Sequence, residues 1–179
     1  EIDSKISMKF ELFFPIKPFT LAQPFGVNGE FYRANDINIF GHNGWDMIGN
    51  DGQICRAAHN GIVTFTGEDG KGGLGIVIRT KDKYLYNNDL VYFKTIYWHL
   101  KLGTFKVIAG QEVKVGDILA ECDNTGFSSG SHLHFGLKPV QKGEQDWEWY
   151  NLEQNNGYMG AIDPFPFWND YYDENATIV

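Results

Sequence analysis

Histidines are the residues of this chain best suited to chemistry, and two of them stand close together. His132 and His134 lie one residue apart in the stretch GSHLHFG, residues 130–136. In a strand, residues two apart point to the same face, so both imidazoles would lie on one side, about 6.6 Å apart. A His-x-His pair on its own is equally compatible with half-exposed imidazoles that have no role. The pair therefore needs partners elsewhere in the chain.

A candidate partner is the stretch GHNGWDM, residues 41–47, which carries His42 and Asp46 four residues apart. In a helix this interval would put both side chains on one face, as in zinc-binding His-x-x-x-His arrangements. Gly41 and Gly44 favour a bend that runs into a strand, which also brings two side chains to one point. The alternative is a Gly/Asn-rich turn in which Asp46 caps backbone amides.

Together these residues resemble the ligand set of a catalytic zinc site. Such sites commonly take three protein ligands from His, Asp or Glu and leave a fourth position to water. His42, Asp46 and one member of the pair His132/His134 supply such a set. Bound zinc lowers the pKa of water from about 15.7 to about 7. The remaining member of the pair and His99 would then serve as base, acid or oxyanion donor.

The other two histidines differ in context. His99 lies in YWHL, and we expect it to face the site while its neighbour Trp98 faces the other way. His59 lies in AAHNGIV, where His-Asn-Gly resembles a hairpin turn, and we interpret His59 as structural.

The pattern of the chain predicts an all-β protein. Met8, Phe10 and Leu12 alternate with polar residues, which is typical of a half-buried strand, and Pro15 and Pro18 then end the alternation. Runs rich in β-branched and aromatic residues follow, separated by Gly, Asp and Asn turns, and they predict an antiparallel meander. These runs are GIVTFTG (61–67), GIVIRT (75–80), LVYFKTIYWHL (90–100), FKVIAG (105–110), QEVKVGD (111–117), ILAEC (118–122) and SHLHFGLKP (131–139). Only residues 143–157 have helix-like spacing, and they predict either one short helix or an aromatic surface loop.

Composition limits the classes of function. The chain has 179 residues, 42% of them hydrophobic and 16% aromatic, which suits one folded domain. A net charge of −8 removes the electrostatic basis for broad binding to nucleic acid or to an anionic membrane surface. No apolar run reaches the roughly 18 residues of a membrane helix, and the early run FELFFPI does not fit a signal-peptide core. Cys55 and Cys122 lie in apolar surroundings, and we expect buried thiols rather than a disulfide.

Three motifs in order, HNGWD, YWHL and GFSSGSHLHFG, resemble the lysostaphin and LytM-type zinc endopeptidases. The intervening stretches AAHNGIVTFTG and AGQEVKVGDILAECDNTG resemble that family as well, and IDPFPFW resembles its closing Asp-Pro. The sequence departs from the family pattern at His59, where Asp is usual, at Trp45, where a smaller residue is common, and at Ser131, where Pro is frequent. Residues 28–41 and 81–95 do not align, and we expect loops there that shape the groove.

The resemblance implies specific roles. It implies that His42, Asp46 and His134 bind one Zn²⁺ per chain and that His99 and His132 are the catalytic histidines. It implies strongly twisted antiparallel β-sheets, a duplicated or sandwich-like arrangement with a catalytic groove and loop elaborations. It also implies hydrolysis of peptide bonds in bacterial peptidoglycan, in cross-bridges or stem-peptide links.

From this resemblance we predict three segments: an N-terminal strand and loop extension (1–20), a zinc endopeptidase core (21–140) and an aromatic-rich C-terminal extension packed on the core (141–179). We expect the protein to act outside the cytoplasm, secreted, periplasmic or wall-associated, or in a phage virion. Because the acidic chain gains no attraction to anionic wall polymers, we expect a fused or assembled module to deliver it.

Two rival interpretations use the same sequence. An inactive homologue would keep the scaffold and bind wall peptide or a protein partner, but such homologues usually lose metal ligands, and all five positions are filled here. A carrier domain of the biotinyl or lipoyl kind is suggested by GQEVKVGDILAE, but it would need an attachment lysine at a hairpin tip, and none is found.

Overall fold

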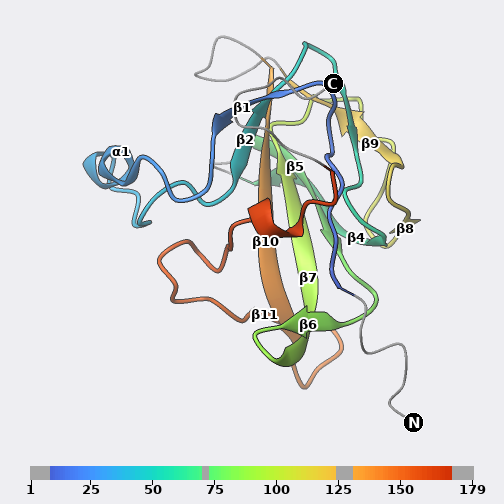
Figure 1. Cartoon of the computed structure of the whole chain (residues 1–179). Coiled ribbons are helices and arrows are strands. Elements are labelled where there is room, and N and C mark those ends of the chain that lie inside the picture. The colour runs from blue at the N-terminus through green and yellow to red at the C-terminus, as the bar shows by residue number, and fades with distance from the viewer. Residues whose placement is uncertain (1–8, 70–72, 124–130, 171–179) are drawn as a thin grey trace.

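The fold is built almost entirely from antiparallel strands. The computed structural model describes residues 9–69, 73–123 and 131–170 (Figure 1). Its elements are β1 (Thr20–Gln23), α1 (Gly29–Ala34), β2 (Trp45–Ile48), β3 (Ile54–Arg56), β4 (Gly61–Asp69), β5 (Gly73–Arg79), β6 (Tyr84–Tyr86), β7 (Asp89–Trp98), β8 (Glu112–Val113), β9 (Ile118–Glu121), β10 (His132–Lys142), β11 (Trp149–Asn151) and the 3₁₀ turn η1 (Phe165–Phe167). None of the described helices has the length and apolar character needed to cross a bilayer. The predicted all-β class is confirmed.

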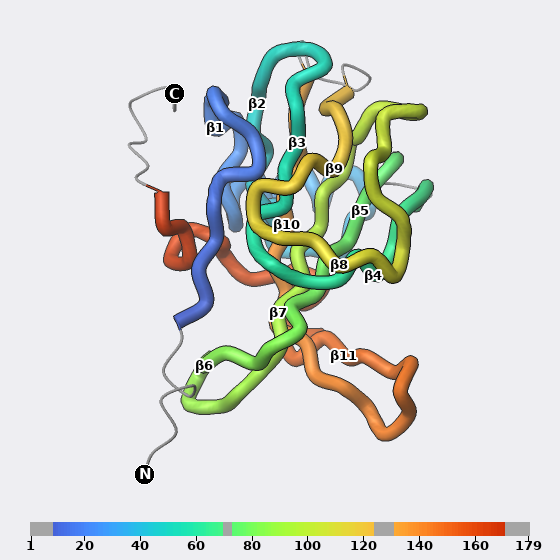
Figure 2. Tube along the Cα trace, turned by 90° about the vertical axis from the view of Figure 1, so that its right-hand side faces the viewer, coloured from blue at the N-terminus to red at the C-terminus, as the bar shows by residue number. Residues whose placement is uncertain are grey.

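Two sheets share one core. The large twisted sheet has the order β1-β2-β10-β7-β5-β4-β8, with β11 paired to β10 and β6 paired to β7. The small sheet is the pair β3–β9, which lie side by side in Figure 2. Buried residues of both sheets, such as Cys55 and Leu119 from the small one and Phe93 and Phe135 from the large one, belong to one hydrophobic cluster. The sheets therefore pack against each other, in agreement with the sandwich-like arrangement that the family resemblance implies.

Strand β10 lies at the centre of the large sheet and has two different faces. It pairs with β2 on one side and with β7 on the other. Leu133, Phe135 and Leu137 are fully buried in the core, whereas His132 and His134 alternate with them and are only partly buried. Because side chains alternate across a strand, the two histidines share the face that is turned away from the core.

The N-terminal segment contributes to the core without forming a long strand. Phe10, Leu12 and Phe14 are buried, which agrees with the predicted alternation, while Met8 lies outside the described residues. Leu12 makes only an isolated parallel bridge with Trp168, and its amide donates to the carbonyl of Phe167 at 2.8 Å. The two ends of the described chain therefore meet over the core, and the first ladder begins at β1.

Residues 143–157 form no helix. Within them, β11 pairs with β10, so that Trp149 lies opposite Lys142, and turns make up the rest. The helical alternative is wrong because the β10 edge offers backbone hydrogen bonds to this segment, as in the bond from the Gly143 amide to the Glu148 carbonyl at 2.9 Å. The predicted loops also contain regular structure: α1 lies within 28–41, and β6 and part of β7 lie within 81–95.

The two cysteines are buried free thiols, as expected. Cys55 lies in β3, and Cys122 follows the neighbouring strand β9. Burial, together with the neighbouring Cys122, raises the pKa of the Cys55 thiol. The Cys55 thiol is therefore protonated and behaves as a small apolar side chain.

His59 is a buried structural residue, but not in a hairpin. The strand before it, β3, belongs to the small sheet, and the strand after it, β4, belongs to the large sheet. The chain therefore crosses between the two sheets at His59. The ring is 5% exposed, its Nδ1 lies 2.8 Å from the Asn60 carbonyl, and its Nε2 lies 2.7 Å from the Thr95 hydroxyl. Burial lowers its pKa from 6.5 to about 4.

This buried histidine makes stability depend on pH. The unfolded chain binds a proton at residue 59 below about pH 6.5, whereas the folded chain binds it only near pH 4. The free energy of unfolding therefore decreases as the pH falls from 6.5 to 4, by on the order of 3 kcal/mol for this group. His59→Gln, which does not titrate, should show a smaller decrease over this window in urea unfolding at a series of pH values. Equal decreases in the two proteins would contradict the assignment.

Candidate metal centre and neighbouring histidines

The register of the central strands places His134 beside Asp46. In the antiparallel pair β10–β2, His134 lies directly opposite Asp46. Directly opposite residues point to the same face, with Cβ atoms about 5 Å apart. The Nδ1 atom of His134 consequently lies 2.9 Å from Oδ1 of Asp46. The bend predicted for residues 41–44 leads into β2, as expected.

His42 reaches the same point from the loop before β2. Its amide donates to the Val27 carbonyl at 2.8 Å, and its carbonyl accepts from the Gly26 amide at 2.8 Å. Its Nδ1 lies 3.2 Å from the Pro24 carbonyl. Because a carbonyl only accepts, Nδ1 carries the proton in this contact, and Nε2 presents a lone pair. This backbone contact orients the ring as outer hydrogen bonds do for metal-binding histidines.

The three side chains converge on one point. The Nε2 atom of His42 lies 3.1 Å from Nδ1 of His134 and 3.2 Å from Oδ1 of Asp46. Zinc bonds of about 2.0–2.2 Å in a tetrahedral site place ligand atoms about 3.3 Å apart, within a few tenths of an ångström of these distances. Each of these three atoms has a lone pair that it could present to a cation in place of the hydrogen bonds that they share here. The donor set therefore fits a divalent metal, and it is the one such group among the described residues.

The electrostatics favour the charged carboxylate. Burial alone would raise the pKa of Asp46, but hydrogen bonds and charge interactions with His134 and His42 outweigh burial and hold that pKa well below its ordinary value. A carboxylate and two imidazoles leave net positive charge on a bound divalent ion, as a hydrolytic site requires.

His99 and His132 form a second pair beside this group. Their ring centroids lie 4.4 Å apart, and the His99 centroid lies 6.5 Å from that of His134. Burial first, and then the charges of His132 and His134, lower the pKa of His99 to about 4. All five residues singled out from the sequence are thus brought together.

The expectation that Trp98 and His99 face opposite sides is wrong. Trp98 lies directly opposite His134 across β7–β10, and therefore shares its face. His99 reaches that face as well because its φ of +66° turns the chain at the end of β7. A left-handed conformation at a non-glycine residue costs about 1–3 kcal/mol and concentrates at functional sites. The amide of Asp123 donates to the His99 carbonyl at 3.0 Å and fixes this turn.

Two supporting residues were not singled out from the sequence. Tyr32 in α1 stacks beside His42 with ring centroids 6.4 Å apart, and its hydroxyl accepts from the side-chain Nε2 of Gln23 at 3.0 Å. Pro24 contributes only its carbonyl. Neither residue carries a local motif, and Tyr32 belongs to residues 28–41, which do not align.

Gly44 leaves the space that the His134 ring occupies. A Cβ at residue 44 would lie 2.4 Å from the Phe135 carbonyl oxygen and 2.9 Å from two His134 ring atoms. We expect Gly44→Ala to displace the ring and to weaken zinc binding by about 10–100-fold, the usual cost of disturbing a ligand's support. Competition with a chromophoric chelator measures this affinity. The control is Gly136→Ala in β10, the strand of His134, since a Cβ there would meet only ordinary contacts at 3.6 Å or more. Equal zinc affinities of the two variants would contradict the prediction.

Comparison with known proteins agrees with this geometry. Residues 40–146, more than half of the chain, match the sequence profile of peptidase family M23. The chain belongs to peptidase family M23. The M23 match includes His42, Asp46, His99, His132 and His134.

Individual M23 relatives show the extent of the likeness. The chain is 31% identical over 158 residues to the glycyl-glycine endopeptidase ALE-1 of Staphylococcus capitis, covering 86% of this chain and 34% of that protein. The catalytic domain of lysostaphin from Staphylococcus simulans superposes with a TM-score of 0.53 at 24% identity, covering 88% of this chain and 91% of that one. A zinc-containing peptidase from Vibrio cholerae superposes with a TM-score of 0.56 at 25% identity, covering 74% of this chain and 37% of that one. The chain thus spans about a third of the length of ALE-1.

One departure from the M23 pattern has a local explanation. The bulky Trp45 is 2% exposed, and its ring lies 5.4 Å from the Trp168 ring between centroids. The aromatic segment after residue 160 therefore provides the space and contacts that a large residue at position 45 requires.

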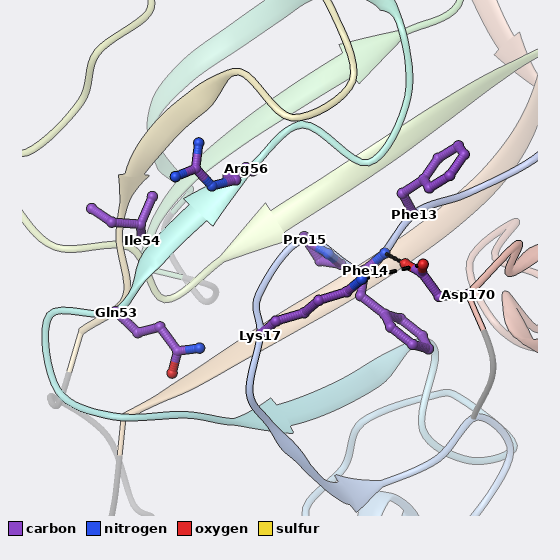
Figure 3. Close-up of a pocket in the computed structure, with 8 residues that line it drawn as sticks. All are labelled: Phe13, Phe14, Pro15, Lys17, Gln53, Ile54, Arg56 and Asp170. Atoms are coloured by element: carbon purple, nitrogen blue, oxygen red, sulfur yellow. Dashed lines mark hydrogen bonds and ion pairs between the residues drawn. The ribbon is translucent and has the colours of Figure 1, made fainter. Parts of the chain in front are cut away.

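A separate cavity is lined by Phe14, Lys17 and Asp170, among other residues (Figure 3). It has a volume of about 500 Å³ between the N-terminal segment and β3. Asp170 lines it, accepting from the Phe14 amide at 2.9 Å and pairing with Lys17 at 3.2 Å. Of the metal-site and neighbouring histidines, none lines this cavity, so we assign it to the packing of the two ends of the described chain.

Proposed function

We propose that this M23 domain is a zinc-dependent endopeptidase that hydrolyses peptide bonds in bacterial peptidoglycan, in cross-bridges or stem-peptide links. The observation that carries the proposal is the convergence of His42, Asp46 and His134 within 2.9–3.2 Å, next to a second pair of histidines. Membership of the M23 family and the likeness to a glycyl-glycine endopeptidase and to a zinc-containing peptidase support it.

The proposed roles follow from position. His42, Asp46 and His134 would hold the zinc ion, which when bound polarises the scissile carbonyl and makes hydroxide available at neutral pH. His99 and His132 lie beside the ligands on the open face, within reach of a substrate placed there. A neutral imidazole of this pair would take a proton from the attacking water, and the protonated ring would pass it to the leaving amine. The other ring would donate a hydrogen bond to the oxyanion.

The proposal extends to where the domain works. Residues 21–140 would form the hydrolytic core, with 1–20 and 141–179 as extensions of the same body. The substrate places the reaction outside the cytoplasm, at the wall, in the periplasm or on a phage virion. Because the net charge is −8, we infer that a neighbouring module or assembly delivers the domain to the wall. Tight binding of this chain alone to sacculi at moderate salt would overturn this inference.

Elemental analysis and dye release from purified sacculi test the function together. We expect about one zinc per chain and chelator-sensitive release from sacculi of one of two cross-link types, glycine-bridged or directly linked. Release that persists unchanged after complete removal of the metal would overturn zinc dependence. Zinc without release from either wall type would favour an inactive homologue that binds wall peptide or a protein partner.

A further inference from the structure

Three basic residues form a row across the large sheet. Arg79 in β5 lies directly opposite Lys94 in β7, and Lys94 lies directly opposite Lys138 in β10. Directly opposite residues on neighbouring strands point to the same face. The row Arg79–Lys94–Lys138 therefore presents three positive charges side by side.

This face is the one that carries the metal site. Lys138 follows His134 by four residues in β10, and both alternate with the buried Leu133 and Leu137. Four residues of strand correspond to about 13 Å. Trp98 lies on this face opposite His134 and over Gly75, and the pair Gly136 and Ile96 lies between the levels of His134 and Lys138.

The two lysines of the row do not stabilise the fold by lying side by side. Like charges directly opposite each other on a sheet are destabilising. Burial, and then the charge of Lys94, lower the pKa of Lys138 to about 8, and burial lowers the pKa of Lys94. Among the residues that the structure describes, no carboxylate lies within 4.0 Å of any of the three basic groups. Arg79 stacks on Trp149 at 3.6 Å, and its Nε is buried without a hydrogen-bond partner.

A cavity of about 390 Å³ is lined by two members of the row, Lys94 and Lys138. Its walls include Lys94 and Lys138 together with the apolar side chains of Phe65, Ile96 and Trp98. Glu68 and Asp69 line it from β4 and are exposed at its rim. Two lysines at the floor attract a single negative group, while the acidic rim repels an extended polyanion. The cavity therefore suits a small anion carried on a larger, largely uncharged molecule.

We propose that Lys94 and Lys138, reinforced by Arg79, form a subsite that binds a carboxylate of the peptide substrate about 13 Å from the scissile bond. The inference rests on the proposed function for the identity of the substrate as wall peptide. Ammonium–carboxylate hydrogen bonds are among the strong ones in proteins, and a partly buried site strengthens them. The subsite would thus select stem peptides with free carboxyl groups over amidated ones.

Binding of a matched pair of peptides tests the subsite independently of hydrolysis. The probes are the stem tetrapeptide L-Ala-γ-D-Glu-L-Lys-D-Ala with both carboxyl groups free and the same peptide with both converted to primary amides. Isothermal titration of the zinc-loaded chain should give a dissociation constant at least about tenfold lower for the free acid, as a charge-assisted contact provides. Lys138→Met and Lys94→Met should each bring the ratio of the two dissociation constants, diamide over free acid, close to one. Lys138→Arg keeps the charge and should preserve the preference for the free acid.

Lys114→Met is the matched control, because Lys114 is exposed in the turn between β8 and β9 and its loss changes the net charge equally. The ratio of the two dissociation constants in this control should equal that of the parent chain. Thermal unfolding verifies that each variant is folded, and removal of a partly buried like charge should not lower the midpoint. A ratio near one in the parent, or a ratio that survives Lys138→Met, overturns the subsite.

The two proposals fail separately. Dye release from sacculi together with a parent ratio near one would keep the endopeptidase and remove the subsite. A tenfold ratio that disappears in Lys138→Met, without release from any sacculus, would keep the subsite and remove the proposed hydrolysis.

Discussion

His134→Ala is expected to abolish stoichiometric zinc binding and, with it, hydrolysis. The substitution removes one of three atoms that converge within 2.9–3.2 Å and leaves only His42 and Asp46. Loss of a residue that merely supports a ligand weakens metal binding by about 10–100-fold, so loss of a ligand should exceed a hundredfold. Elemental analysis after dialysis, and titration against a chromophoric chelator, measure the effect.

The control for this experiment is a histidine outside the metal group. His59→Gln removes an imidazole that contacts Asn60 and Thr95 rather than the metal group, and it should retain about one zinc per chain. If His134→Ala kept the parent zinc content, the ligand assignment would be wrong.

His132→Ala is expected to separate metal binding from turnover. His132 lies in the same strand as His134, but its ring packs against His99, with centroids 4.4 Å apart, and it is not one of the three converging residues. The variant should bind zinc like the parent chain and show a kcat lower by about 10²–10⁴-fold, the usual contribution of one acid–base group.

Dye release at saturating substrate, normalised to measured zinc, gives this comparison. A variant with full zinc and near-parent kcat would mean that His132 takes no part in proton transfer. A variant that loses zinc together with activity would assign His132 to the ligands instead. Zinc content and kcat, measured on His134→Ala and His132→Ala, therefore distinguish the roles of His134 and His132 independently of each other.

The strands and the members of the histidine site were predictable because their signals are local. GIVTFTG, GIVIRT and LVYFKTIYWHL alternate or run apolar over the lengths that strands require, and β4, β5 and β7 lie there. His42 and Asp46 are close in sequence, and so are His132 and His134. The stretch GFSSG before the second pair, residues 126–130, lies outside the described residues.

The errors arose where distant partners decide the structure. The spacing of Trp147 and Tyr150 fits a helix equally well, but pairing with β10 forms β11 instead. His-Asn-Gly at 59–61 looks like a hairpin, yet the strands on either side belong to different sheets. The orientation of His99 depends on one left-handed φ, which no neighbouring residue type predicts.

The row Arg79–Lys94–Lys138 could not be predicted for the same reason. Its three members are separated by 15 and 44 positions in the numbering, and each alone resembles an ordinary surface cation. Only the register of β5, β7 and β10 places them side by side. A proposal on substrate preference therefore required the sheet itself.

The central position of β10 has a consequence for the order in which the chain becomes active. The contacts of His134 with Asp46 and His42 join residues 88 and 92 positions apart, and contacts over such distances form slowly because long loops must close first. During synthesis, the residues of β2 and β7 leave the ribosome well before those of β10. The candidate metal centre is therefore incomplete in any nascent chain that ends before residue 134, because His134 has not yet inserted beside Asp46 and His42.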